Sequence, residues 1–306
     1  MVLYNAYPSD PAMKPPPFKY IAAESVEHTL ELMEEHGEAA KLLAGGQSLI
    51  PAMNFRVLQP SVLIDLNRIE DLEYIRRADD GALVVGAMTR QRDLEQSHDV
   101  ERVAPLLYEA MPHIAHPQIR TRGTIGGSLA HADPAAELPA VAIAAGASMK
   151  ASGPIGDRWI EAKDFFEGMF STALGPNEML VEVTFPAMTS QTGWRFEETS
   201  RRRGDYAMMG VAVEVMVDDE GACKEARLVY LNAGDGPIEA ENAAAMLCGE
   251  RPTQELIAAA AAEAADHEID PMGNVHASID FQRHLARVLT ERALLKAFAR
   301  GGNSKT

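Results

Sequence analysis

The feature that most constrains this chain is a pair of short segments with nearly the same wording, each built on two adjacent glycines. The first glycine segment is Ala44-Gly45-Gly46-Gln47-Ser48-Leu49, and the second is Thr124-Ile125-Gly126-Gly127-Ser128-Leu129-Ala130. Glycines let a backbone approach a ligand closely, and successive N–H groups that point one way bind anions, phosphates above all. Taken alone, each segment is equally consistent with a simple tight turn. Together in one domain, the two segments predict a clamp for the two phosphates of a dinucleotide.

Other nucleotide and metal motifs are missing from the sequence. Neither glycine segment is followed by the Gly-Lys-Ser/Thr of a P-loop, and neither matches the Gly-x-Gly-x-x-Gly of a Rossmann fold. His113, His116 and His131 do not have zinc-ligand spacing with any cysteine. No Ser-His-Asp arrangement is legible, so we expect neither a catalytic residue nor a metal site in this chain.

The chain has only two cysteines, Cys223 and Cys248, and no Cys-x-x-Cys pair. It therefore cannot hold an iron–sulfur cluster by itself. A disulfide between them is possible, but a reducing cytoplasm disfavours it. We expect instead that both thiols are buried and inert.

Charge and hydropathy exclude further classes of protein. The formal net charge is −17, so no basic face is available to neutralise a nucleic acid or to meet an anionic membrane surface. No apolar stretch is long enough to span a bilayer. The N-terminal residues 1–8 lack the basic region and apolar core of a secretion signal. We therefore expect a cytoplasmic protein.

Periodicity and chain breakers predict an alternation of helices and strands. Ser25 is a suitable N-cap for a helix through His36, which Gly37 can end, and Asp133 is expected to cap a helix that begins at Pro134. Further helices are predicted over residues 103–111, 137–145, 252–265 and 278–300, and strands over residues 41–44, 61–66, 82–87, 179–185, 206–217 and 226–231, with another strand after Gly146.

A stretch rich in Pro, Ser, Thr and Gly at residues 186–193 suggests a domain boundary. We expect a flexible extension over residues 1–13, a first domain over 14–188 with subdomains of about 14–67 and 68–188, a C-terminal α+β domain over 189–300, and a tail over 301–306. Strands followed by helices in the last third fit a small antiparallel sheet with a helical layer.

The longer stretches around the two glycine segments, residues 41–51 and 117–140, resemble the FAD-binding medium subunits of molybdenum hydroxylases. That family includes the flavin subunit of carbon monoxide dehydrogenase and the flavin domain of xanthine dehydrogenase. Residues 61–66, 85–89 and 201–207 support the similarity, which runs from about Met13 to about Arg300. The resemblance implies an α+β fold: a two-subdomain FAD-binding domain of the vanillyl-alcohol-oxidase/PCMH type, followed by a small antiparallel sheet with a helical layer.

The resemblance also implies which residues bind FAD. Both glycine segments would hold the pyrophosphate through backbone amides, with hydroxyls as further donors, and Glu137 has the position of a carboxylate, usually Asp, that binds the ribityl or ribose hydroxyls. Ile114 and Leu180 would touch the flavin rings, although by pattern they are ordinary core residues. The expected FAD contacts are Leu43, Ala44, Gly45, Gly46, Gln47, Ser48, Leu49, Ile114, Thr124, Ile125, Gly126, Gly127, Ser128, Glu137, Leu180 and Tyr206.

Four places leave alternatives open or depart from the family. Gln47 stands where some relatives have His, and Glu198 stands where several have a Lys near the flavin, so another cation or water must balance the pyrophosphate. The triplet Arg201–Arg203 is either a solvated loop or a contact for an acidic partner or the cofactor. Tyr206 is either a cover for one flavin face or a buried strand residue.

By resemblance, the chain is the FAD-binding electron-transfer subunit of a molybdenum hydroxylase. An iron–sulfur small subunit with 2Fe-2S clusters would pass electrons to its FAD, and a molybdopterin large subunit would act on the substrate, in a dimer of heterotrimers. FAD suits this role because it takes one or two electrons. Two alternatives are a stand-alone FAD-dependent oxidase and a non-catalytic nucleotide-binding scaffold subunit.

Overall fold

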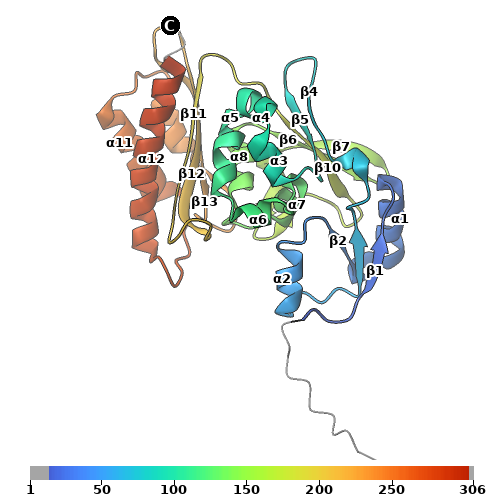
Figure 1. Cartoon of the computed structure of the whole chain (residues 1–306). Helices are drawn as coiled ribbons and strands as arrows, with labels where there is room; N and C mark the ends of the chain where they lie inside the picture. The colour runs from blue at the N-terminus through green and yellow to red at the C-terminus, as the bar shows by residue number, and fades with distance from the viewer. Residues whose placement is uncertain (1–13, 303–306) are drawn as a thin grey trace, which may run out of the picture.

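The computed structural model describes residues 14–302, which are organised around a three-stranded, a five-stranded and a four-stranded sheet (Figure 1). The predicted extension, residues 1–13, lies outside the described residues, as do residues 303–306. Three hydrophobic clusters accompany the three sheets. The unit with the five-stranded sheet lies between the other two in Figure 1.

The first subdomain is a small parallel sheet in the order β1-β3-β2, with β3 in the centre. All four residues of β3 are buried, as expected for a strand paired on both edges. Ser25 Oγ accepts a hydrogen bond from His28 N at 3.1 Å, which confirms the predicted helix cap. The elements are β1 (Lys19–Ala22), α1 (Val26–His36), η1 (Gly37–Ala39), β2 (Ala40–Leu43), α2 (Leu49–Asn54), β3 (Val62–Asp65) and η2 (Glu70–Leu72).

The second subdomain is a five-stranded sheet in the order β4-β5-β10-β6-β7, covered by short helices. All eight residues of α8 are buried, so this helix forms the centre of the molecule. The strands are β4 (Ile75–Arg77), β5 (Leu83–Gly86), β6 (Ser148–Gly153), β7 (Gly156–Glu161) and β10 (Met179–Phe185), with a hairpin of β8 (Phe166–Gly168) and β9 (Ser171–Thr172). The helices are α3 (Gln91–Gln96), α4 (His98–Val103), α5 (Pro105–Ala110), η3 (Met111–His113), α6 (Pro117–Arg120), α7 (Ile125–His131), α8 (Glu137–Ala144) and α9 (Ala162–Phe165).

The C-terminal unit is an antiparallel sheet in the order β11-β12-β13-β14 with a helical layer. Side chains alternate between the faces of a strand: Val211 and Val213 pack with α12, and Ala212 packs into the cluster that contains α8. This sheet is therefore buried on both faces. Its elements are β11 (Thr192–Ser200), β12 (Ala207–Val217), β13 (Cys223–Leu231), β14 (Ile238–Glu239), α10 (Glu241–Leu247), α11 (Gln254–Glu263), η4 (Ala264–Glu268) and α12 (Ile279–Gly302).

Three sequence predictions are wrong in detail. The helix predicted over 103–111 is divided at Ala104, because Pro105 begins a new helix and disfavours helical geometry in the residue before it. Asp133 does not cap a helix at Pro134: its Oδ1 accepts a hydrogen bond from Ala135 N at 2.9 Å, and α8 begins only at Glu137. Gly301 and Gly302, assigned to the tail, lie in α12.

The second glycine segment is also not the loop that we expected, because residues 125–131 form α7. Thr124 is the N-cap of this helix, with extended backbone angles, and its Oγ1 accepts a hydrogen bond from Gly127 N at 3.0 Å. The two glycines therefore occupy the first turn of a helix.

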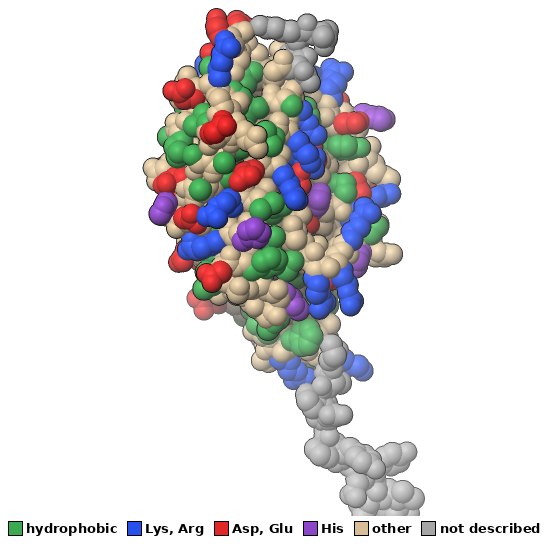
Figure 2. Space-filling view, turned by 90° about the vertical axis from the view of Figure 1, so that its left-hand side faces the viewer, with side chains coloured by type: hydrophobic (Ala, Val, Ile, Leu, Met, Phe, Trp, Pro, Cys, Tyr) green, Lys and Arg blue, Asp and Glu red, His purple; other side chains and the backbone are tan. Residues whose placement is uncertain are grey.

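The face that carries α11 and α12 shows acidic, basic and hydrophobic side chains interspersed (Figure 2). The net charge of −17 is thus not gathered into one acidic patch on this face. Among residues 14–302, no helix has the length and apolar character needed to cross a membrane.

Candidate functional site

A cavity of about 380 Å³ opens where the first subdomain meets the second. It lies at the carboxyl ends of β2 and β3, which are adjacent parallel strands and so bring their following loops to one edge of the sheet. Strand-end crevices of this kind are common ligand sites in sheets with helical crossovers. The cavity is lined by Leu43, Ala44, Gly45, Gly46, Gln47, Ile50, Pro51, Asn54, Asp65, Asn67 and Arg122.

The first glycine segment forms one wall of this cavity as an open loop. Gly46 has φ +72°, a backbone conformation that side chains with a Cβ rarely adopt. Gln47 Nε2 donates to Gly45 O at 3.0 Å and so braces the loop internally. Within the described part of the chain, the N–H groups of residues 45–48 have no acceptor. Four neighbouring amides are therefore free to bind an anion.

The backbone amides of the second glycine segment, by contrast, already donate hydrogen bonds within the protein. Ile125 N donates to Thr89 O at 3.1 Å, and Gly126 N donates to Ala87 O at 2.9 Å. Gly127 N donates to Thr124 Oγ1 at 3.0 Å. Ser128 N donates to Thr124 O at 3.2 Å, the first bond of helix α7. The first two donors hold the helix against the segment that follows β5, and the other two close its first turn on Thr124.

The glycines at the contact between the two segments are required by close packing. A Cβ on Gly45 would lie 2.3 Å from the carbonyl oxygen of Arg122. A Cβ on Gly126 would lie 2.6 Å from both Cβ and the carbonyl oxygen of Ala87. A Cβ on Gly127 would still be 3.5 Å from Ala44 Cβ, although it would approach Thr124 Oγ1 to 2.8 Å. The first segment thus packs closely on the backbone that precedes the second segment, and the second packs closely on the segment that follows β5.

Arg122 is a basic residue at the cavity that was not among the predicted contacts. It lies two residues after α6 and two residues before the second glycine segment, and it lines the cavity with an exposed side chain. Arg90 Nη1 donates to Arg122 O at 2.7 Å and fixes this part of the backbone. The signal in the sequence was the pair of arginines in Arg120-Thr121-Arg122, next to the predicted phosphate-binding motif.

A polar network holds the floor of the cavity. Asn67 Nδ2 donates to Ala44 O at 3.0 Å, and Asn67 Oδ1 accepts from Arg90 Nη2 at 2.7 Å. Asp65 accepts hydrogen bonds from the Tyr20 hydroxyl and from Asn67 N. Burial alone would raise the pKa of Asp65, but these hydrogen bonds hold it below its usual value. The carboxylate is therefore a fixed, charged anchor of the loop.

A second group of functional candidates surrounds the start of α8. The Glu137 side chain belongs to a residue only 8% exposed, and burial, reinforced by the charge of Glu198, raises its pKa to about 8. Glu198 Oε1 lies 3.2 Å from His113 Nδ1, while Glu198 Oε2 is buried without a partner. Near neutral pH this arrangement favours a protonated Glu137, which can donate a hydrogen bond as well as accept one.

Tyr206 lies at the edge of this group with an exposed ring, so the alternative of a buried strand tyrosine is wrong. Partial burial of its hydroxyl, followed by the charges of Asp133 and Glu137, raises the pKa of Tyr206. Ile114 and Leu180 are both buried in the core of the second subdomain. Neither lines the cavity, nor do the predicted contacts Ser48, Leu49, Thr124, Ile125, Gly126, Gly127 and Ser128.

The arginine triplet is at the turn between β11 and β12, and all three of its residues are exposed. Arg201 Nε lies 3.3 Å from Asp205 Oδ2, an ion pair within the turn. Gly204 has φ +88°, and a Cβ there would lie 2.4 Å from the His116 ring. The turn therefore rests against the segment that precedes α6, and its three cations point into solvent.

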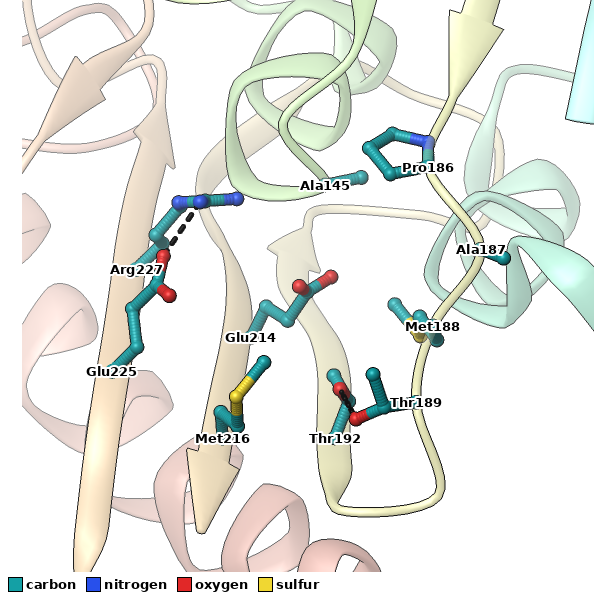
Figure 3. A pocket seen from close by; sticks show the side chains of 10 residues that line it. All are labelled: Ala145, Pro186, Ala187, Met188, Thr189, Thr192, Glu214, Met216, Glu225 and Arg227. Carbon is teal, nitrogen blue, oxygen red and sulfur yellow. Dashed lines mark hydrogen bonds and ion pairs between the residues drawn. The ribbon is translucent and has the colours of Figure 1, made fainter. Parts of the chain in front are cut away.

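A smaller cavity, of about 170 Å³, lies between the end of α8, the 186–189 connection and the C-terminal sheet (Figure 3). Glu214 projects into it, and burial raises the pKa of Glu214 to about 7, partly opposed by Arg227. Arg227 is held by Glu225 at 2.6 Å. None of the residues predicted to bind FAD lines this cavity.

Comparison with known proteins assigns both halves of the chain. Residues 16–188 match the family described as FAD binding domain in molybdopterin dehydrogenase, and residues 194–297 match the CO dehydrogenase flavoprotein C-terminal domain. The chain is 44% identical to the 6-hydroxypseudooxynicotine dehydrogenase complex subunit alpha of Paenarthrobacter nicotinovorans, over 96% of this chain and 98% of that protein. It is 40% identical to the carbon monoxide dehydrogenase medium chain of Hydrogenophaga pseudoflava, over 94% and 99% respectively.

Solved structures show the same similarity in three dimensions. Carbon monoxide dehydrogenase from Hydrogenophaga pseudoflava, in a form lacking the Mo-pyranopterin moiety of its cofactor, matches with a TM-score of 0.91 at 41% identity. That match covers 94% of this chain and 99% of the other. Quinoline 2-oxidoreductase from Pseudomonas putida 86 matches with a TM-score of 0.89 at 34% identity, with the same coverage. The predicted fold class is confirmed over the described residues.

Proposed function

Since the chain belongs to the family of FAD-binding medium subunits of molybdenum hydroxylases, we propose that it carries electrons from an iron–sulfur subunit to an external acceptor. The observation that carries the proposal is the cavity lined by Arg122 and by Gly45, Gly46 and Gln47, whose N–H groups have no acceptor among the described residues. FAD, when bound, supplies the ability to take electrons singly or in pairs. The chain contributes binding, orientation and charge.

The pyrophosphate of FAD fits the wall formed by the first glycine segment. The free N–H groups of residues 45–48 satisfy phosphate oxygens, and Arg122 supplies the positive charge that Gln47 lacks. Asn67 holds the loop through its hydrogen bond to Ala44 O, and Asp65 in turn accepts a hydrogen bond from Asn67 N. We propose that the second glycine segment contributes mainly by placing Arg122 and the first segment, while Leu43 and Ala44 complete the apolar side of the cavity.

The ribityl chain and the flavin rings fit the group around the start of α8. A protonated Glu137 is suited to sugar hydroxyls, because it offers both a donor and an acceptor in a buried place. Tyr206 has an exposed ring that can cover one flavin face. Ile114 and Leu180 support this region from the core. Glu198 puts negative charge where relatives with Lys have positive charge, which disfavours an additional electron on a nearby ring system.

The proposed partners are an iron–sulfur small subunit and a molybdopterin large subunit, in a dimer of heterotrimers within the cytoplasm. Similar medium chains belong to enzymes named for 6-hydroxypseudooxynicotine, carbon monoxide and caffeine. Such different substrates on similar medium chains indicate that another subunit selects the substrate. The exposed arginine triplet is the proposed docking surface for the iron–sulfur subunit.

We also propose the domain division at residues 14–188 and 189–300, with subdomains meeting near residue 67. Support comes from the three hydrophobic clusters, each of which is built mainly around one of the three sheets. Under this division, the cavity lies between the two subdomains of the FAD-binding domain. The C-terminal unit then covers α8 from the other side.

A visible spectrum of the purified chain, followed by co-purification with metal analysis, tests the function. We expect about one flavin per chain, released completely by acid precipitation, together with two further subunits that contain iron and molybdenum. A colourless chain that takes up no added FAD would contradict the proposal and favour a scaffold role. A yellow chain that purifies alone and oxidises a substrate would favour the stand-alone oxidase.

A further inference from the structure

The two cysteines, distant in the sequence, are brought side by side in the C-terminal unit. Cys223 begins β13, and Cys248 immediately follows α10. The two residues form an isolated parallel β-bridge. Cys223 N donates to Glu250 O at 2.8 Å, and Gly249 N donates to Cys223 O at 2.7 Å. Backbone hydrogen bonds on both sides therefore fix the separation of the two residues.

This separation suits a disulfide. Neighbouring strands lie about 4.8 Å apart in the hydrogen-bonding direction, within the range of about 4.4–6.8 Å between the Cα atoms of bridged cysteines. The parallel β-bridge places the two cysteines next to each other. Burial raises the pKa of the Cys223 thiol to about 12, and the charge of the neighbouring Cys248 adds to this effect.

The two thiols differ in their access to solvent, which gives each a different part in an oxidation. Cys223 is 1% exposed, whereas Cys248 is exposed, so the expectation of two buried thiols is wrong for Cys248. Cys248 Sγ donates to Ala244 O at 3.4 Å, and Cys223 Sγ donates to Glu225 O, also at 3.4 Å. An oxidant from solution can therefore reach the Cys248 thiol directly, whereas the Cys223 thiol is buried and can react only after Cys248.

We propose that Cys223 and Cys248 form a reversible dithiol–disulfide site that reacts with low-molecular-weight disulfides such as glutathione disulfide. The Cys248 thiolate attacks one sulfur of glutathione disulfide and releases one glutathione thiolate. Cys223 gives up its proton and attacks the Cys248 sulfur of the mixed disulfide, which releases the second glutathione. The two cysteines lose two electrons, glutathione disulfide gains them, and the two protons end on two glutathione molecules.

The bond would link the start of β13 to the end of α10, across the whole of β13, β14 and α10. It would therefore constrain the C-terminal sheet at the edge of its helical layer. Neither cysteine lines the FAD cavity, so oxidation is expected to leave the flavin content unchanged. Failure of this proposal is therefore separate from failure of the proposed FAD site.

The test treats the full chain with glutathione disulfide and then digests it with trypsin without reduction. Cleavage after Arg203, Lys224, Arg227 and Arg283 places Cys223 in residues 204–224 and Cys248 in residues 228–283, because the Arg251–Pro252 bond resists trypsin. We expect these two peptides to appear covalently joined. Dithiothreitol should separate them, and the oxidised chain should show a higher Tm than the reduced chain.

Two variants assign the roles of the thiols. Cys223→Ser should accumulate a stable mixed disulfide with one glutathione on Cys248, whereas Cys248→Ser should remain unmodified. The proposal is overturned if the native chain accumulates the same mixed disulfide without joined peptides, or if neither thiol reacts while the chain is folded. Joined peptides between different chains, recognised by a dimer on a non-reducing gel, would overturn it as well.

Discussion

The two glycine segments have nearly the same sequence but differ in conformation and in role. The first is an open loop whose N–H groups at residues 45–48 have no acceptor among the described residues. The second is the first turn of α7, and its amides are all engaged by Thr89, Ala87 and Thr124. The first therefore offers hydrogen bonds to a ligand, and the second packs closely on the segment that follows β5.

The difference follows from what surrounds each pair of glycines. Thr124, an extended residue with a hydroxyl, can cap a helix and thereby uses Gly127 N. Ser48 is the N-cap of α2, but its backbone is helical and its hydroxyl makes no capping bond. Glycine thus serves two purposes: positive φ at Gly46, and close backbone approach at Gly45 and Gly126.

The largest effect is expected from adding a methyl group where the second segment packs. Gly126→Ala puts a Cβ 2.6 Å from Ala87, whose backbone cannot move away cheaply, so the free energy of unfolding should fall by about 3 kcal/mol. Thermal unfolding of the FAD-free chain measures this loss. Gly236→Ala is the control, because a Cβ there meets nothing within 4 Å. Equal stability of the two variants would show that the second segment is not closely packed.

The second-largest effect is expected on the affinity for FAD and not on the stability of the chain. Arg122→Ala removes the cation that lines the cavity, and FAD affinity should fall by about 1.5–3 kcal/mol, or roughly 10- to 100-fold in Kd. The free energy of unfolding should change little, because the side chain is exposed. Fluorescence titration with FAD measures the affinity, with the exposed Arg77→Ala as control. If the two variants bind FAD equally well, the charge balance of the site must come from elsewhere.

The carboxylates beside the two segments should respond differently to pH. The pKa of Glu137 is raised to about 8 in the fold, so the folded chain holds its proton more tightly than the unfolded chain. Stability should therefore decrease as pH rises from about 4.5 toward 8, by about 1.4 kcal/mol per pH unit. Asp65 has a lowered pKa and contributes the opposite slope only at more acidic pH.

Glu137→Gln should remove that slope between pH 5 and 8, and the exposed Glu161→Gln is the matched control. Chemical unfolding of the FAD-free chain at several pH values measures how the free energy of unfolding depends on pH. A slope that persists in Glu137→Gln would assign the titration to another group, of which the half-buried Glu214 is the first to test.

The smallest effect compares the two hydroxyls that begin α2 and α7. Thr124→Val removes a capping acceptor and should lower the free energy of unfolding by about 1 kcal/mol. Ser48→Ala should leave stability nearly unchanged, because Ser48 makes no capping bond. Unfolding curves of both variants measure these two changes in the free energy of unfolding. A larger loss for Ser48→Ala would reverse the roles assigned to the two segments.

Sequence reasoning succeeded where local chemistry alone decides the structure. The helix at Val26–His36 has a Ser25 cap and a Gly37 end, and strand Met179–Phe185 forms where it was predicted. The expected alternation of buried and exposed residues in that strand is wrong, because both of its faces are buried. Sequence reasoning also failed where distant parts compete for the same group. Thr124 and Thr89 take the amides of the second segment, and Asp133 bonds to Ala135 instead of capping a helix.

The part of the candidate site that depends on local sequence was predictable, and the part that depends on contacts between distant residues was not. Residues 43–47 do line the cavity, because a glycine pair after a strand is a local signal. Arg122, Asn67 and Arg90 were missed, because their meeting depends on how the two subdomains pack. The raised pKa of Glu137 likewise depends on Glu198, which is contributed by the C-terminal sheet.

Amide hydrogen exchange, measured with and without FAD, tests the contrast between the two glycine segments most directly. Exchange at residues 45–48 should be fast in the FAD-free chain, where those amides have no acceptor, and should slow strongly when FAD binds. Exchange at residues 125–128 should already be slow without FAD and should change little. Slowing by FAD at residues 125–128, with residues 45–48 unaffected, would contradict the account.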